Sequence, residues 1–473
     1  MHAKARRARI LFWMLSLAGC AAHRYQPAPI VPTETASRLQ GRSLDDPALR
    51  AFLETNLGHS LTDWPLQNWD FRTLSLAALY FNPTLATVRA RVEEAQAVVV
   101  TAGARPNPNL SIAPGVPSPY LLSLDFSIPI ETAGKRGHRI QFARSLSQAA
   151  RFDLADSAWK VRSGVRIVLV NYLLASRSVD LLRSEEQVRT EQAGILEQRL
   201  SVGEIPRPEV DFARIELSKT HLAIRIAEGQ LAETKAALAA SIGVPVNALH
   251  DVAFSWPGFD SPPNIESLTP KEIARDAVIN RLDVRRSLAQ YAAAEADLQL
   301  EIVKQYPDVQ IGPGYTYEEK NNFFTIGFST TLPVFNRNQG PIAEAEARRK
   351  EAAAAFLEKQ AQVIAESDRA LALYTGALKE LEEADESLRK LQDSQQRAVQ
   401  NAVRVGEEDQ LALNGVRIEA SVVGRIRLDA LSRAQTALGE LEDAVQRPLA
   451  PGDALLFNPE SPTANKLPKE PNR

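Results

Sequence analysis

The sequence predicts a mainly helical chain with two pairs of membrane-type β-strands, organised as two copies of one structural unit. Two stretches without proline are far longer than the helices of ordinary domains. Each follows two segments of roughly ten residues in which apolar side chains alternate with polar or small ones, the pattern of a strand with two different faces. The order helix, two strands, very long helix, glycine turn, helix occurs twice.

The composition favours long packed helices and gives no sign of an enzyme. Hydrophobic residues make up 44% of the chain, which excludes wholesale disorder, whereas aromatic residues make up only 6%. The net charge of −3 provides no basic footprint for nucleic acid. The six histidines are scattered without the paired spacing of a metal site. We therefore expect no catalytic residues, no metal site and no cofactor.

Residues 1–19 have the composition of a secretory signal peptide. Basic residues precede an apolar run, Ile10 to Ala18, that is too short to span a bilayer as a helix. Small residues then precede Cys20, the only cysteine. This ending resembles the bacterial lipoprotein signal, in which the cysteine is acylated, for example with palmitate. Ala21, rather than aspartate, then implies an outer-membrane destination. We expect the protein to be lipid-anchored through Cys20.

The first structural copy is assigned to residues 74–245. Its first helix should break at Asn82-Pro83, because proline is favoured at a helix start. A helix at 139–202 would be on the order of 90 Å long, which no compact domain needs. The segments predicted up to this point are an N-terminal extension at 20–73, a helix from Leu74, a β-hairpin at 108–130, a long helix at 139–202 and a helix at 209–241.

The second copy repeats the first about two hundred residues later. A shift of 199 places Pro307 on Pro108, and a shift of 203 places Val405-Gly406-Glu407 on Val202-Gly203-Glu204. Chance similarity between alanine-rich helices does not explain matched prolines, glycine turns and strand pairs in the same order. The predicted segments are a linker or equatorial segment at 246–270, a second copy at 271–447 with a hairpin at 307–335 and helices at 341–405 and 408–447, and a tail at 448–473.

The strands have one apolar and one polar face. In the second copy Phe324, Ile326 and Phe328 alternate with Thr325 and Gly327. Such segments suit a membrane β-barrel, but four strands cannot close one, and open edges in lipid would leave backbone groups unpaired. Three protomers would pool about twelve strands, within the known range of such barrels. The alternative is a soluble α+β domain whose hairpins pack on helices.

At this point the chain resembles the TolC-like outer membrane factors over nearly its whole mature length. The most specific parts are Asn82-Pro83-Thr84-Leu85, the Pro129 to Arg136 segment, Pro333-Val334-Phe335-Asn336 and the two Val-Gly-Glu helix tips. The resemblance implies a homotrimer whose twelve-stranded outer-membrane barrel continues as a long coiled-coil α-barrel across the periplasm. It also implies service as the exit duct of a tripartite efflux pump, with a periplasmic adaptor and an inner-membrane RND-type pump as partners.

The sequence indicates the transported substrate, or cargo, less clearly than it indicates the fold. The Glu131 to Arg136 run and the Leu49 to Leu53 patch resemble ducts of the cobalt-zinc-cadmium efflux type, which implies heavy-metal cations. The alternatives are a drug-efflux or type I secretion outlet, or a periplasmic coiled-coil lipoprotein scaffold or adaptor. An adaptor would show one helical hairpin flanked by soluble β-domains, whereas this chain has two hairpins, each preceded by membrane-type strands.

The two helix tips contain the candidate functional residues. Their carboxylates, which would number about twelve in a trimer, would concentrate cations at the periplasmic entrance; alternatively, they only favour a helix start electrostatically. The Val-Gly pairs resemble the family's docking site for the adaptor; alternatively, the glycines only end the helices. The predicted entrance residues are Glu204, Glu407, Glu408 and Asp409, and the predicted docking residues are Val202, Gly203, Val405 and Gly406.

Overall fold

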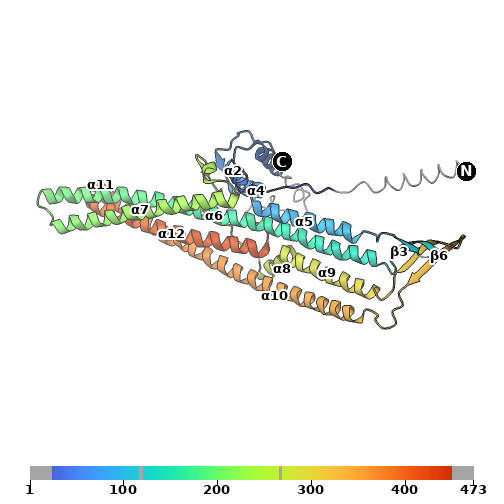
Figure 1. Ribbon diagram of the computed structural model, residues 1–473. Coiled ribbons are helices and arrows are strands. Elements are labelled where there is room, and N and C mark those ends of the chain that lie inside the picture. The colour runs from blue at the N-terminus through green and yellow to red at the C-terminus, as the bar shows by residue number, and fades with distance from the viewer. Residues whose placement is uncertain (1–23, 117–120, 266–268, 450–473) are drawn as a thin grey trace. The chain divides into compact units, whose positions relative to one another are not determined.

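The computed structural model describes residues 24–116, 121–265 and 269–449 (Figure 1). The chain divides into two units after Arg42. The described part of the first unit contains one helix, α2 (Pro32–Gln40). The second unit contains all the elements discussed below. Cys20 and the predicted signal peptide lie outside the described residues.

The second unit contains the repeated elements in the predicted order. The helices of its first half are α3 (Pro47–Leu57), α4 (Phe71–Phe81), α5 (Pro83–Ala102), α6 (Lys135–Ser201), α7 (Arg207–Ile242) and the 3-10 turn η1 (Val246–Leu249). Those of its second half are α8 (Pro270–Asn280), α9 (Leu282–Val303), α10 (Gln339–Glu383), the π-helical turn η2 (Ala384–Arg389), α11 (Lys390–Val405) and α12 (Gln410–Val445). The strands are β1 (Asn68–Trp69), β2 (Asn109–Gly115), β3 (Leu121–Ile130), β4 (Ala253–Phe254), β5 (Val309–Glu318) and β6 (Asn321–Thr330).

Local sequence signals explain several helix ends. The Asn82 side chain accepts a hydrogen bond from the Thr84 amide at 3.0 Å, so α4 ends and α5 begins at the predicted Asn-Pro break. Thr269 caps α8 through a capping box with Glu272, and Pro270 occupies the first turn. These breaks follow from residue chemistry alone.

The long helix α6 has 67 residues and is therefore about 100 Å long. It begins at Lys135 rather than at residue 139, because Gly134 adopts a left-handed conformation (φ 73°) that redirects the chain directly into the helix. The side chains of Val165, Val179 and Leu182, which lie along one side of the helix, are buried. The helix packs along α7 toward one end and along α5 and α9 toward the other.

The equivalent helix of the second half is not a single α-helix, as predicted at 341–405. The π-helical turn η2 separates α10 from α11. Within this turn Asp385 accepts a hydrogen bond from Arg427 of α12, with 2.5 Å between Nε and Oδ1. The wider hydrogen-bonding pattern of a π-turn has no signature in the apolar spacing, so the interruption was not predictable.

The four long strands form an antiparallel sheet in the order β2-β3-β5-β6. The second strand of the predicted hairpin at 307–335 is β6, which begins at Asn321, before the alternation at Phe324, and ends at Thr330. It begins early because Glu319 and Lys320 both have positive φ, the geometry of a two-residue hairpin turn. It ends early because Thr330 pairs with Val309, the first residue of β5, so later residues have no partner in this sheet.

The segment from Ser43 to Asp70, predicted as part of an extension, belongs to the core. Leu49 and Leu53 of α3 are fully buried, in the same cluster as Leu74 of α4 and Val165 of α6. The spacing of Leu49, Phe52 and Leu53 gives α3 one apolar stripe. A second cluster joins α8, α10 and α12. Among the helices of the described residues, none is both long and apolar enough to cross a bilayer.

Candidate functional site

The sheet exposes one apolar face. Ile112 is 60% exposed, and on β6 Phe324 and Ile326 are 82% and 85% exposed. The strand register extends this face across the sheet, because Ile112 lies opposite Leu124, and Tyr315 lies opposite Phe324. On the other face polar side chains meet, as in the 3.0 Å hydrogen bond from Ser127 to Gln310. Apolar exposure on this scale argues against the soluble α+β alternative.

The sheet also has two open edges, β2 and β6. The helices that continue from it have the same arrangement: α5 packs on α6, α6 on α9 and α9 on α10. Figure 1 shows these four helices as a row beside the strands, with α5 at one edge and α10 at the other. Strands and helices therefore end at matching edges, as expected of one segment of a closed ring.

The segment that joins β3 to α6 ties the two halves of the chain together. Asp308, which precedes β5, accepts hydrogen bonds from the Thr132 amide at 3.0 Å and from the Lys135 ammonium at 2.7 Å. Glu131 pairs with Arg139 of α6. The Glu131 to Arg136 run, which suggested a cation-efflux type, thus has a structural role at the end of the sheet.

Both helix tips are built in the same way. Gly203 and Gly406 have φ values of 77° and 81°, a conformation that favours glycine. In each tip the following glutamate amide donates to a carbonyl five residues earlier: Glu204 to Arg199 and Glu407 to Ala402, both at 2.9 Å. The glycines are therefore required by helix termination, whatever else the tips do.

An arginine that the sequence analysis missed connects the two tips. Arg199 of α6 donates to the Asp409 carboxylate at 2.8 Å, and its Nε lies 3.9 Å from Glu204. Asp409 also accepts from the Ala412 amide at 2.9 Å, so it caps α12. This amide and then Arg199 hold the pKa of Asp409 below its usual range. A basic residue in the last turn of α6 was the available signal, but its partner lies 210 residues away.

The structure thus separates the predicted entrance residues into two groups. Glu204 and Asp409 come together around Arg199. Glu407 and Glu408 are exposed and form no ion pair within the described residues. The predicted docking residues Val202 and Val405 are 76% and 64% exposed. Within the described segments, no group of three or more histidine, cysteine, aspartate or glutamate residues is arranged to hold a metal ion.

We expect Arg199→Ala to loosen the tips and to raise single-channel conductance at neutral pH, because it removes the contact between α6 and the start of α12. Because the pKa of Asp409 is lowered, its ion pair with Arg199 persists at every pH above the ordinary aspartate pKa of about 3.9. The pair is lost only when the pH falls through the lowered pKa, where Asp409 takes up a proton. In planar bilayers, wild-type conductance should therefore stay constant from neutral pH to about pH 5. Equal conductance of variant and wild type would contradict this role.

Comparison with known proteins agrees with the class that this geometry defines, one segment of a closed ring of strands and helices. The family model described as outer membrane efflux protein matches residues 74–244. The chain is 28% identical over 276 residues to the cobalt-zinc-cadmium resistance protein CzcC of Cupriavidus metallidurans, covering 58% of this chain and 64% of CzcC. It thus spans slightly less than two thirds of that relative.

Two further similarities cover more of the chain. The pyoverdine export outer membrane protein OpmQ of Pseudomonas aeruginosa is 23% identical over 399 residues, which is 76% of this chain and 83% of OpmQ. The outer membrane protein VceC of Vibrio cholerae has a similar structure, with a TM-score of 0.63 and 20% identity over 79% of this chain and 95% of VceC. Residues 74–244 thus match the outer membrane efflux protein family, and the chain has the TolC-like fold.

This assignment confirms the predicted family and fold class. It also confirms the predicted location in the outer membrane with an extension into the periplasm. The family is one of efflux ducts rather than enzymes.

Proposed function

We propose that this protein is the passive outer-membrane exit duct of a tripartite efflux system and that it has no catalytic activity. The two matching open edges are the observation that carries the proposal. A protomer with an apolar sheet face and unpaired edge strands cannot be stable alone in lipid, because every backbone group there needs a partner. Copies of the same chain provide the missing partners.

The strand count is compatible with three copies, the number that the resemblance to the TolC-like outer membrane factors implies. Three protomers with four strands each would close a barrel of about twelve strands, in which β6 of one protomer pairs with β2 of the next. The same rotation would place α10 against the α5 edge of the neighbour, which closes the helical part. The apolar sheet face would contact outer-membrane lipid, and acylation of Cys20 would add a lipid anchor.

For the cargo we propose heavy-metal cations, supported by the similarity to CzcC. The second candidate is an exported organic molecule, supported by the similarity to OpmQ over a larger share of the chain. In either case the cargo would arrive from an inner-membrane RND-type pump through a periplasmic adaptor.

The helix tips are the proposed contact with that adaptor. Val202 and Val405 present apolar side chains beside Gly203 and Gly406, and their exposure leaves them accessible. Glu407 and Glu408, together with Glu204 and Asp409, would form the charged rim of the entrance.

Co-expression with an adaptor and an RND-type pump of a cation-efflux system tests the whole proposal. We expect detergent-resistant trimers in the outer membrane, cation resistance of the host and co-purification of the adaptor. The variant Val202→Asp with Val405→Asp should lose the adaptor and the resistance while trimers remain. A monomer in all detergents would refute the duct, whereas trimers that confer no metal resistance would favour the second cargo.

The charged rim allows a separate prediction. Changing Glu407 and Glu408 to glutamine should lower the cation-over-anion permeability ratio of single channels, because these carboxylates form no ion pair within the described residues and would attract cations to the entrance. Asp409 should stay unchanged in this variant, since it caps α12. The reversal potential in a salt gradient measures the effect, and its dependence on ionic strength is a control. An unchanged reversal potential would show that Glu407 and Glu408 do not attract cations to the entrance.

A further inference from the structure

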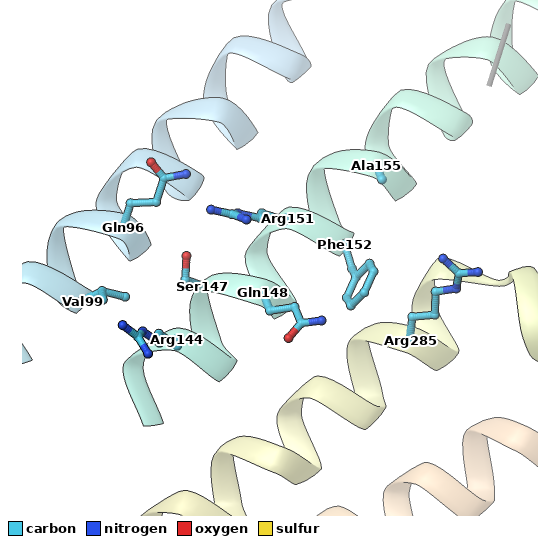
Figure 2. Close-up of a pocket in the computed structure, with 9 residues that line it drawn as sticks. All are labelled: Gln96, Val99, Arg144, Ser147, Gln148, Arg151, Phe152, Ala155 and Arg285. Carbon is cyan, nitrogen blue, oxygen red and sulfur yellow. The ribbon is translucent and has the colours of Figure 1, made fainter. Parts of the chain in front are cut away.

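A groove of about 730 Å³ lies along one face of α6, between α5 and α9. Figure 2 shows Arg144 and Arg151 reaching from α6 toward α5, with Ser147 between them and Gln96 across from them. Phe152 and Arg285 form the opposite side. The lining residues of α6 recur at spacings of three and four, so they share one face of the helix.

The groove is basic and has no acidic lining residue. Within the described residues, Arg144 and Arg151 have no ion pair or hydrogen bond to another side chain. Arg285 donates from Nε to the carbonyl of Ile279 at 3.0 Å, which leaves its terminal nitrogens available. The neighbouring Asp153 is occupied by Arg286, at 2.7 Å. Many other arginines of the helical region are paired with acids in this way, so the groove stands apart.

The spacing of the two arginines restricts what they can bind together. The two arginines are seven positions apart, which places their Cα atoms about 10.5 Å apart along the helix. Their long side chains can converge from both ends on a small anion with two acidic groups. The Ser147 hydroxyl and the Gln96 amide add neutral donors between these ends. Guanidinium groups bind carboxylate and phosphate oxygens in paired hydrogen bonds.

We propose that this groove is a binding site for small anions with two acidic groups, either phosphates or carboxylates, held by Arg144 and Arg151. Arg285 strengthens the positive potential from the other side of α6, and Phe152 and Val99 provide apolar contact for an organic body. The site rests on side chains within one protomer and does not depend on the cargo or on the duct function.

Calorimetric titration of the purified, detergent-solubilised protein with pyrophosphate, and separately with succinate, tests the proposal. We expect saturable binding with a dissociation constant in the millimolar range or below. The variant R144Q/R151Q should bind at least about ten-fold more weakly, because two charge-assisted contacts are lost. The matched control R91Q/R105Q removes two exposed, unpaired arginines outside the groove and should bind as wild type does.

Three outcomes would overturn the site. These are no saturable heat with either probe, equal binding by R144Q/R151Q and wild type, or equal loss in the control variant, which would show only general charge attraction. If R144Q/R151Q does not assemble, the single variant R151Q is titrated in its place. It should also bind the probes more weakly than wild type, and equal binding would overturn the site. Binding of one probe but not the other identifies the acidic group that the groove prefers. Because trimer assembly is measured separately, failure of this site is distinct from failure of the proposed duct.

Discussion

Replacing Gly312 by alanine is expected to abolish the assembly of trimers that resist detergent. Gly312 lies in the middle of β5, and a Cβ atom built on it would overlap the carbonyl oxygen of Phe126 in β3. Backbone atoms of two adjacent strands cannot yield in the way that a flexible side chain does, so β3 and β5 would have to separate. We expect a cost of at least about 3 kcal/mol, at the upper end of overpacking effects.

Gly327 provides the matched control, because it pairs directly with Gly312 across β5 and β6. A Cβ atom there would meet only the Gly312 carbonyl oxygen at 3.5 Å, an ordinary contact. Gly327→Ala should therefore assemble normally. Electrophoresis of unheated membrane samples compares the two variants, and normal trimers of Gly312→Ala would show that the strand contact is not needed for assembly.

The second large effect is expected at Glu442, which is 1% exposed between α6 and α12. Its Oε2 atom accepts from Arg162 at 3.2 Å and lies 3.5 Å from Nε of Arg166, and its Oε1 atom accepts from the Leu449 amide at 2.9 Å. Glu442→Ala would remove the carboxylate that contacts both buried guanidinium groups. Breaking such a buried pair costs about 3–5 kcal/mol. The thermal unfolding transition, followed by circular dichroism, should fall well below that of wild type.

The exposed pair of Arg433 and Glu380 is the control for this prediction. Its atoms are 2.6 Å apart, but both side chains are more than half exposed. Glu380→Ala should therefore change stability by no more than about 1 kcal/mol. Equal shifts in the two variants would show that the buried cluster between α6 and α12 contributes no more than a surface pair.

This buried cluster was not predictable from the sequence, for a physical reason. Arginines at 162 and 166 and a glutamate at 442 look like solvated helix residues when each is read locally. Arg162 also lies over the rings of Phe71 and Trp159, at 4.9 and 4.8 Å. Burial of these charges depends on which faces of α6, α4 and α12 meet. Sequence spacing within one helix does not contain that information.

The same limit explains the tips. Gly203 and Gly406 were predictable as helix ends, because a left-handed residue after a helix favours glycine. The role of Arg199 was not, because it depends on the approach of two hairpins that are distant in the chain. The π-turn at Ala384–Arg389 and the Glu319-Lys320 hairpin turn likewise lack the residue types that usually mark such features.

The sequence by itself determined the repeat, the order of the elements, the two-faced strands and the resemblance to the TolC-like outer membrane factors. These properties depend on periodicity, proline and glycine positions and short motifs, all of which are local. The tertiary structure decided the order of β2, β3, β5 and β6, the row of helices that continues them, the arginine between the tips and the basic groove along α6. These depend on contacts between residues far apart in the chain, because only the packed helices and paired strands bring those side chains within reach of one another.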